Sequence, residues 1–440
     1  MRLMDTQLRV IGGGLAGVEA AWAAARRGIR VRLYEMRPVR STPAHRTGLL
    51  GELVCSNSLK SALPDSASGL LKAELTALGS LCMHAAACSR VPAGNALAVD
   101  PTRFASEITR CIQAHPLIDV VREEWTRIPA ERPLVIATGP LTSPELANRL
   151  SEFTGESLYF YDAIAPTVSY DSLNHDRVFL ANRYGRGEGG YLNCPMNREE
   201  WSRFYDALLQ AETTPFHGAD DPRFFSACMP IEELARRGPD TPRYGPFKPV
   251  GLTDPATGRR PWAALQLRQE DAHGRLWGLV GCQTRMRQGE QARVFRLIPG
   301  LERAEFCRYG AMHRNTYLHA PRLLTPALEF RDHPGLFAAG QLTGVEGYLE
   351  SAMAGLIAGW NAARSLWGRP QVTLPPDTMS GTLLDYIAGF TGKDFQPMNA
   401  NLGILPDPAD APRKRLERHA AKAAATRMAF QRYLSGLEGP

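Results

Sequence analysis

Three glycines near the start of the chain have the spacing of a dinucleotide-binding turn. The segment Gly12-Gly13-Gly14-Leu15-Ala16-Gly17 is a GxGxxG pattern that follows an apolar run. In such a turn the first glycine permits the tight bend, the second lets a pyrophosphate approach the backbone at a helix N-terminus, and the third allows close helix packing. Glu35 lies eighteen residues beyond Gly17 and is expected to accept hydrogen bonds from an adenosine ribose.

The elements around this turn predict an α/β fold with a Rossmann-like, doubly wound sheet. Residues 8–11 and 29–34 read as buried strands, and the alanine-rich residues 18–27 between them read as a helix. Residues 133–137 predict a further strand that ends before Gly139. Residues 335–338 predict another, and residues 345–367 have a long helical pattern.

A second turn far along the chain selects between two cofactors that share the glycine fingerprint. The segment Phe337-Ala338-Ala339-Gly340-Gln341 resembles the second nucleotide-contact motif of flavoproteins, so FAD is favoured over NAD. That motif usually ends in Asp, and Gln341 departs from it. Tyr348 follows at the start of the long helical pattern, where it either stacks on an isoalloxazine or is an ordinary half-buried tyrosine. Gly139 and Gly340 complete the expected cofactor-binding set.

The order of these segments predicts one discontinuous domain with an insertion. We assign residues 1–167 and 321–440 to an FAD-binding domain and residues 168–320 to an inserted α+β domain rich in turn signals. A length of 440 residues accommodates both. No stretch approaches the roughly 20 apolar residues of a membrane helix, and no signal-peptide layout opens the chain, so a cytoplasmic protein is expected.

Charge and cysteine content narrow the function classes. Fifty-one basic residues against 45 acidic ones give a net charge of +6, which is compatible with a polyanionic partner. The eight cysteines are scattered without ligand spacing, so neither a disulfide scaffold nor a metal site is predicted. Residues 413–434 form a basic helical segment that is either a solvated face or a nucleic-acid contact.

Longer motifs connect the chain with a known enzyme family. They are residues 35–38 (Glu-Met-Arg-Pro), 52–59 (Glu-Leu-Val-Cys-Ser-Asn-Ser-Leu), 228–232 (Cys-Met-Pro-Ile-Glu), 248–252 (Lys-Pro-Val-Gly-Leu), 312–316 (Met-His-Arg-Asn-Thr) and 344–348 (Gly-Val-Glu-Gly-Tyr). Together they resemble the folate- and FAD-dependent tRNA (uracil-5-)-methyltransferases over essentially the whole chain. The resemblance implies conversion of a T-loop uridine in tRNA to ribothymidine, with methylenetetrahydrofolate as carbon donor and NAD(P)H as reductant.

The chemistry of that reaction can be argued from uracil itself. Its C5 is a poor nucleophile until a thiolate adds at C6 and converts the ring into an enolate. A methylene carbon needs two more electrons to become a methyl group, and a reduced flavin can supply them as hydride. The C5 proton must also leave, which requires a second acid/base group. One cysteine beside the base and one further proton-transfer residue are therefore expected.

The resemblance assigns candidate residues to these roles. Cys228 corresponds to the C6 nucleophile and Cys55 to the general base or second catalytic thiol, although the opposite assignment stays open. His313 and Asn315 are candidates for contacts with the pterin. Lys248, Arg285 and Arg287 are candidates for contacts with tRNA phosphates, with a solvated surface as the alternative.

Two other functions remain compatible with the residues alone. One is that of the larger FAD proteins that modify the wobble uridine of tRNA with a partner GTPase, which have an additional C-terminal helical domain. The other is a flavin-binding redox sensor in which Cys55 and Cys228 respond to oxidation. Methylation of an unmodified tRNA T-loop separates these readings.

Overall fold

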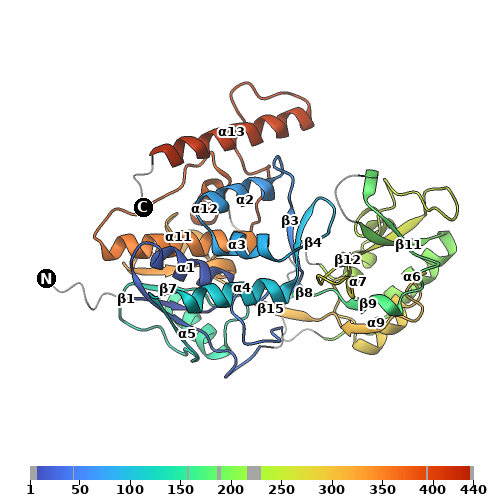
Figure 1. Cartoon of the computed structure of the whole chain (residues 1–440), viewed down its shortest axis with the longest axis horizontal. Coiled ribbons are helices and arrows are strands. Elements are labelled where there is room, and N and C mark those ends of the chain that lie inside the picture. The colour runs from blue at the N-terminus through green and yellow to red at the C-terminus, as the bar shows by residue number, and fades with distance from the viewer. Residues whose placement is uncertain are drawn as a thin grey trace.

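The computed structural model describes residues 7–42, 44–155, 158–185, 190–215, 229–392 and 395–436. These residues build two main hydrophobic cores, the larger one around the first and last thirds of the chain and the smaller one around the middle third. In Figure 1 the larger core lies on the left and the smaller one on the right. None of the helices in the described ranges is long and apolar enough to cross a membrane.

A parallel five-stranded sheet, ordered β16-β7-β1-β2-β6, forms the centre of the larger core. The strands are β16 (Leu336–Ala338), β7 (Leu134–Ile136), β1 (Gln7–Ile11), β2 (Arg30–Tyr34) and β6 (Ile118–Val121). Their apolar side chains are almost entirely buried, as expected for strands covered on both faces. The predicted Rossmann-like α/β fold is confirmed, and β6 is a strand that the sequence did not reveal.

Two helices far apart in the sequence cross closely on this sheet. They are α1 (Leu15–Ala25) and α11 (Tyr348–Leu366), which begins three residues after the predicted start. Any side chain at Gly355 or Gly359 of α11 would collide with the backbone of α1. Gly347 has a φ of +120°, which keeps the preceding residues out of the helix.

The basic C-terminal segment is a helix, α13 (Arg415–Gly436), that packs against α2 (Ala67–Ala77) at the top of Figure 1. Lys422 of α13 is buried and donates hydrogen bonds to the carbonyl oxygens of Leu402 and Leu405. One basic residue of this helix is therefore structural.

The middle third of the chain forms a sheet of its own with six strands, ordered β10-β11-β12-β13-β9-β14. They are β10 (Phe179–Ala181), β11 (Tyr191–Met196), β12 (Ala263–Gln269), β13 (Leu276–Leu279), β9 (Thr167–Ser169) and β14 (Phe306–Arg308). Strands β8 (Leu158–Ala163) and β15 (Met312–Tyr317) form an antiparallel pair. In the sequence, β8 precedes the six strands of this sheet and β15 follows them. The expected boundary at 167/168 divides β9.

Further elements complete the two regions. Around the larger core lie β3 (Ser58–Ser61), β4 (Arg90–Val91), β5 (Ala96–Val99), α3 (Leu81–Cys88), α4 (Pro101–Ala114), α5 (Pro144–Thr154), α10 (Ala320–Leu323), the 3-10 turn η4 (Gly340–Thr343) and α12 (Met379–Gly389). The middle third adds the 3-10 turns η1 (Tyr170–Ser172) and η2 (Arg183–Gly185) and the helices α6 (Arg198–Gln210), α7 (Ile231–Arg236), α8 (Asp240–Tyr244) and α9 (Gln288–Phe295).

Candidate active site

The glycine fingerprint forms the turn between β1 and α1. Gly12 has a φ of +101°, and a Cβ there would collide with Ala137. A Cβ at Gly17 would collide with the carbonyl of Gly12. The turn and the helix can therefore pack this closely only because both positions are glycine. At Gly14, by contrast, no atom lies within 4 Å of the Cβ position. The backbone there faces open space at the first turn of α1, as an approaching pyrophosphate requires.

Glu35 closes this cleft at the end of β2. Its Oε2 accepts from the Gly13 amide at 2.8 Å, and its Oε1 accepts from the Arg37 amide at 2.9 Å and from Arg37 Nε at 2.8 Å. Burial opposes ionisation, but the Arg37 contacts and the Gly13 amide together hold the pKa of Glu35 below its ordinary value. Since a carboxylate can accept about four hydrogen bonds, one acceptor position remains for a ribose hydroxyl.

A second cavity adjoins the cleft, with Leu141 lining both. Cys55, Asn315, Gln341 and Tyr348 all line this cavity, although they are contributed by three separate segments, around residues 55, 315 and 341–348. Four of the candidate residues are therefore brought together beside the glycine turn. Gly139 and Gly340 lie at the ends of β7 and β16, with φ angles of +69° and +75°.

The segment that carries Cys55 is held from two sides. The hydroxyl of Tyr348 accepts hydrogen bonds from the backbone amides of Cys55 at 2.8 Å and Ser56 at 3.0 Å. From the other side, Arg268 of β12 donates to Ser56 Oγ at 2.7 Å and to Asn57 Oδ1 at 2.8 Å. These contacts fix the backbone at Cys55, a role for Tyr348 that the sequence did not suggest.

Charged residues at the same cavity were also missed by the sequence reasoning. Lys60 Nζ lies 2.7 Å from Glu350 Oε1 and 3.9 Å from Glu346 Oε2, and both Lys60 and Glu346 line the cavity. A side chain at Gly347 would collide with Glu350 and Lys60. The available signal was position, because Lys60 directly follows the motif at 52–59 and Glu346 lies inside the motif at 344–348.

The side chains of two candidate residues lie outside the part of the chain that the structure describes. Cys228 lies outside the described residues. His313 pairs with Asp162 between β15 and β8, but its side chain also lies outside the described part.

Among the other cysteines, Cys82, Cys194 and Cys282 are buried, and burial raises the pKa of each thiol. The thiolate, not the thiol, is the nucleophile. These three thiols therefore stay protonated and belong to the cores, whereas Cys55 is only half-buried and faces the cavity.

Comparison with known proteins identifies the family of this site. Residues 7–370 match the family model described as "Glucose inhibited division protein A". The chain is 57% identical over 422 residues to the "Methylenetetrahydrofolate--tRNA-(uracil-5-)-methyltransferase TrmFO" of Moorella thermoacetica, covering 96% of this chain and 97% of the relative. The protein of that name from Geobacter sulfurreducens is 53% identical over 92% of this chain and 93% of the relative. The chain belongs to the TrmFO family.

The resemblance drawn from the motifs is thereby confirmed. Among solved structures, this TrmFO chain is similar to GidA of Aquifex aeolicus in its form II crystal, with a TM-score of 0.73. The alignment covers 100% of this chain and 75% of GidA at 18% identity, so it shows a shared fold.

The three basic residues expected at tRNA phosphates occupy different settings in this TrmFO chain. Arg285 is buried, and its guanidinium lies 2.6 Å from Glu233 Oε1 and 3.0 Å from the carbonyl of Thr214. Arg287 is exposed and lies 2.9 Å from Glu212. Lys248 is half-buried in the loop after α8. The Arg285 charge is therefore already balanced inside the protein.

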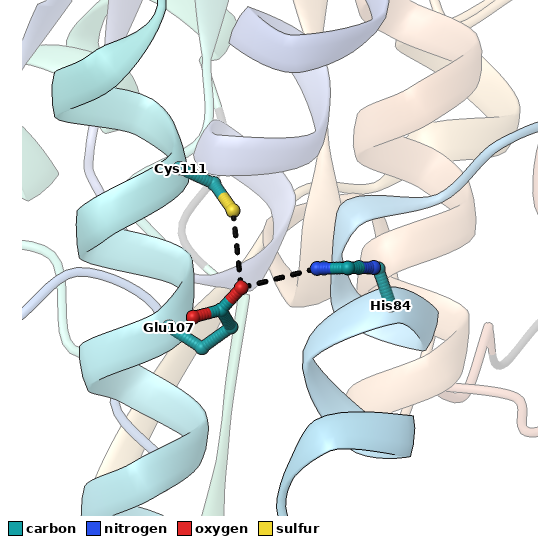
Figure 2. A group of neighbouring side chains, drawn as sticks. All are labelled: His84, Glu107 and Cys111. Atoms are coloured by element: carbon teal, nitrogen blue, oxygen red, sulfur yellow. Dashed lines mark hydrogen bonds and ion pairs between the residues drawn. The ribbon is translucent and has the colours of Figure 1, made fainter.

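A separate cluster in this TrmFO chain has the residue types of a metal site. His84 of α3 and Glu107 and Cys111 of α4 point toward one another, as Figure 2 shows. Arg110 holds both oxygens of Glu107 at 2.9 and 2.6 Å. This contact lowers the pKa of Glu107 to about 2, while burial raises the pKa of the Cys111 thiol. A guanidinium thus already holds the carboxylate, and the thiol is protonated.

Proposed function

We propose that this chain converts the T-loop uridine of tRNA to 5-methyluridine, taking the carbon from methylenetetrahydrofolate and electrons from a resident FAD that NAD(P)H reduces. The observation that carries the proposal is the cavity where Cys55 meets Gln341 and Tyr348 beside the glycine turn. Relatives that are 53–57% identical over nearly the whole chain have names that state a methylenetetrahydrofolate-dependent methyl transfer to C5 of a uracil in tRNA. The fold supports the flavin part of the proposal.

The residues of the cleft fit FAD. Open space lies in front of Gly14, where a pyrophosphate would lie against the first turn of α1. Glu35 offers a fixed carboxylate for the adenosine ribose, and the cleft continues into the cavity at Leu141. When bound and reduced, FAD supplies the hydride that turns a methylene into a methyl group. Gln341 and Tyr348 line the cavity in which the flavin ring would lie.

The cysteines carry the chemistry on uracil in this proposal. Cys228 adds to C6 and forms a carbon–sulfur bond, so that C5 can attack the methylene carbon, which stays bonded to one nitrogen of tetrahydrofolate. Cys55 then takes the C5 proton as that carbon–nitrogen bond breaks and tetrahydrofolate leaves. The exocyclic methylene left on C5 takes up the hydride and becomes a methyl group, and the carbon–sulfur bond breaks to restore the ring. Tyr348 holds the Cys55 amide and Arg268 holds the Ser56 side chain, so the backbone that carries the Cys55 thiol is fixed from two sides. The reverse assignment of the two thiols is an outcome that the trapping experiment below distinguishes.

The remaining candidates have supporting roles in the proposal. Asn315 is buried at the cavity and offers an amide for the pterin, and His313 is proposed to contact the same ring. Lys248 and Arg287 are proposed at tRNA phosphates. The division into residues 1–167 with 321–440 and residues 168–320 is also kept as a proposal, supported by the two separate cores.

Isotope transfer tests the proposed function. We expect label from methylenetetrahydrofolate, but not from S-adenosylmethionine, to appear in the T-loop uridine of a tRNA transcript when NAD(P)H is present. A transcript with cytidine at that position is the matched control and should take up no label. Label from S-adenosylmethionine, or label in the control transcript, would contradict the proposal.

A further inference from the structure

A groove in the middle third of the chain has the composition of a surface for unpaired nucleic acid. It lies among the end of β11, the start of α6, helix α8 and the loop that leads into β12. Strand β11 and helix α6 are on the right of Figure 1. We call it the arginine groove and define it by Arg198, Arg243, Tyr244, Arg259, Arg260 and Trp262. None of these residues belongs to the cavity at Cys55.

Two aromatic rings are displayed in the arginine groove. Tyr244 is 64% exposed and Trp262 is 38% exposed, although both rings are large enough to belong in a core. The Arg243 guanidinium lies 4.6 Å from the centre of the Tyr244 ring and 4.4 Å from that of Trp262. Arg198 lies 5.5 Å from the Trp262 ring. Alternating aromatic and guanidinium planes are the surfaces on which unstacked bases stack.

The charge of the groove is incompletely balanced. Arg177 at its edge is paired with Glu200 at 2.7 Å, and Arg243 is paired with Asp240 at 2.8 Å. Within the described ranges, Arg198, Arg259 and Arg260 have no carboxylate partner. The groove is lined by five arginines and by three carboxylates, those of Asp176, Glu200 and Asp254, so basic residues exceed acidic ones by two. This excess of positive charge on a concave surface attracts a phosphate backbone.

The backbone presents these side chains in a fixed arrangement. The loop before β12 is closed by hydrogen bonds from the Asp254 amide to the Arg259 carbonyl at 2.9 Å and from the Gly258 amide to the Asp254 carbonyl at 2.8 Å. The Asp254 side chain also accepts from the Ala256 amide and the Thr257 hydroxyl. The Asp254 carboxylate is therefore held inside the loop, and within the described ranges it forms no ion pair with the arginines.

Strand β12 connects the groove to the proposed active site. Trp262 immediately precedes β12, and its amide donates to the Met196 carbonyl at 2.9 Å. Six residues later, Arg268 holds Ser56 and Asn57 beside Cys55. At about 3.3 Å per residue, the two ends of this segment lie roughly 20 Å apart. The groove is therefore too far from Cys55 to hold the reacting uridine.

We propose that the arginine groove binds an unpaired stretch of the RNA substrate, with bases stacked on Trp262 and Tyr244 and phosphates held by Arg198, Arg259 and Arg260. The identity of that RNA as tRNA rests on the proposed function. The stacking and charge argument itself requires only single-stranded RNA.

Binding by the purified flavoprotein tests the groove with two probes, a tRNA transcript and an unstructured twelve-residue oligouridylate. We expect Arg259→Ala with Arg260→Ala to weaken binding of both and to reduce the slope of log Kd against log salt by about 1.4, or about 0.7 for each lost phosphate contact. Trp262→Ala should weaken binding about 5- to 140-fold with an unchanged slope, since a stacked base is worth about 1–3 kcal/mol. Trp262→Phe should retain most of the affinity.

A double variant, Arg110→Ala with Arg149→Ala, is the charge-matched control because both side chains are exposed and lie on α4 and α5. It should bind both RNAs like the wild type. Arg259 and Arg260 are exposed, and within the described residues their side chains form no hydrogen bond or ion pair, so their double variant should fold. That variant therefore decides the proposal even if Trp262→Ala does not fold.

Each outcome has one meaning. Groove variants that bind both RNAs with wild-type affinity and slope, or a wild-type protein that binds neither RNA, overturn the groove. The wild-type protein could also bind oligouridylate, lose that binding in the groove variants, and yet transfer no methyl group to tRNA. That result supports the groove and rejects the proposed function.

Discussion

Replacing Tyr348 with phenylalanine removes one hydroxyl and leaves the ring in place. That hydroxyl accepts from the amides of Cys55 and Ser56, at 2.8 and 3.0 Å. Each hydrogen bond contributes about 0.5–1.5 kcal/mol, so the closed arrangement of the segment should lose about 1–3 kcal/mol. Arg268 still holds Ser56 and Asn57, so the segment should open more often rather than unfold.

Amide hydrogen exchange of residues 53–58 measures this opening directly. A loss of 1–3 kcal/mol corresponds to exchange that is about 5- to 140-fold faster at Cys55 and Ser56, with faster alkylation of the Cys55 thiol. Methyl transfer should fall because the thiol is held in place less often. Tyr205→Phe is the matched control, since its hydroxyl donates to the Ala235 carbonyl in the other core. Wild-type exchange and turnover in Tyr348→Phe would refute the reasoning.

Three further changes test other parts of the account. Gly14→Leu should fold yet purify without bound flavin, because the new side chain enters only the open cleft. Gly289 also faces open space, so Gly289→Leu is the control and should keep its bound flavin. Bound flavin in Gly14→Leu would contradict the site assignment. Burial lowers the pKa of Lys72 from 10.5 to about 8, so the folded state binds fewer protons than the unfolded chain between these values. The unfolding free energy of the protein should therefore rise by about 3 kcal/mol from pH 8 to 10.5 because of this lysine. Urea unfolding should show that Lys72→Met lacks this rise, and the same pH dependence in wild type and Lys72→Met would contradict the prediction. Replacing Arg413, Arg415 and Arg418 together with glutamine should reduce the salt slope of tRNA binding by up to about 2, and an unchanged slope would return these residues to the solvated face.

The parts of the fold set by local pattern were predictable. The apolar runs gave β1, β2, β7 and β16 within a residue or two, because strands buried on both faces read as continuous apolar segments. The start of α11 was predicted three residues too early, because Gly347 has a φ of +120° directly before the helix. A helical pattern alone does not reveal a positive φ at a glycine.

The sequence predicted which residues belong to the candidate site, but not how they contact one another. Motifs placed Cys55, Asn315, Gln341 and Tyr348 in the site, and the structure brings them to one cavity. The contacts between them were not accessible, because Tyr348 meets Cys55 across almost three hundred residues and Arg268 reaches Ser56 from the other core. For Arg285, the sequence did not show that Glu233 lies beside it.

The central claim is that uracil is activated by a thiol of this site, and trapping with tRNA that contains 5-fluorouridine tests it most directly. Fluorine blocks removal of the C5 substituent, so the thioether to C6 should accumulate as a covalent complex. We expect mass spectrometry of the digested complex to place the RNA on Cys228, with Cys228→Ala losing the complex and Cys55→Ala binding tRNA without turnover. An adduct that vanishes only in Cys55→Ala reverses the two roles. A complex on the exposed Cys88 or Cys307, or none with any cysteine, would contradict the account.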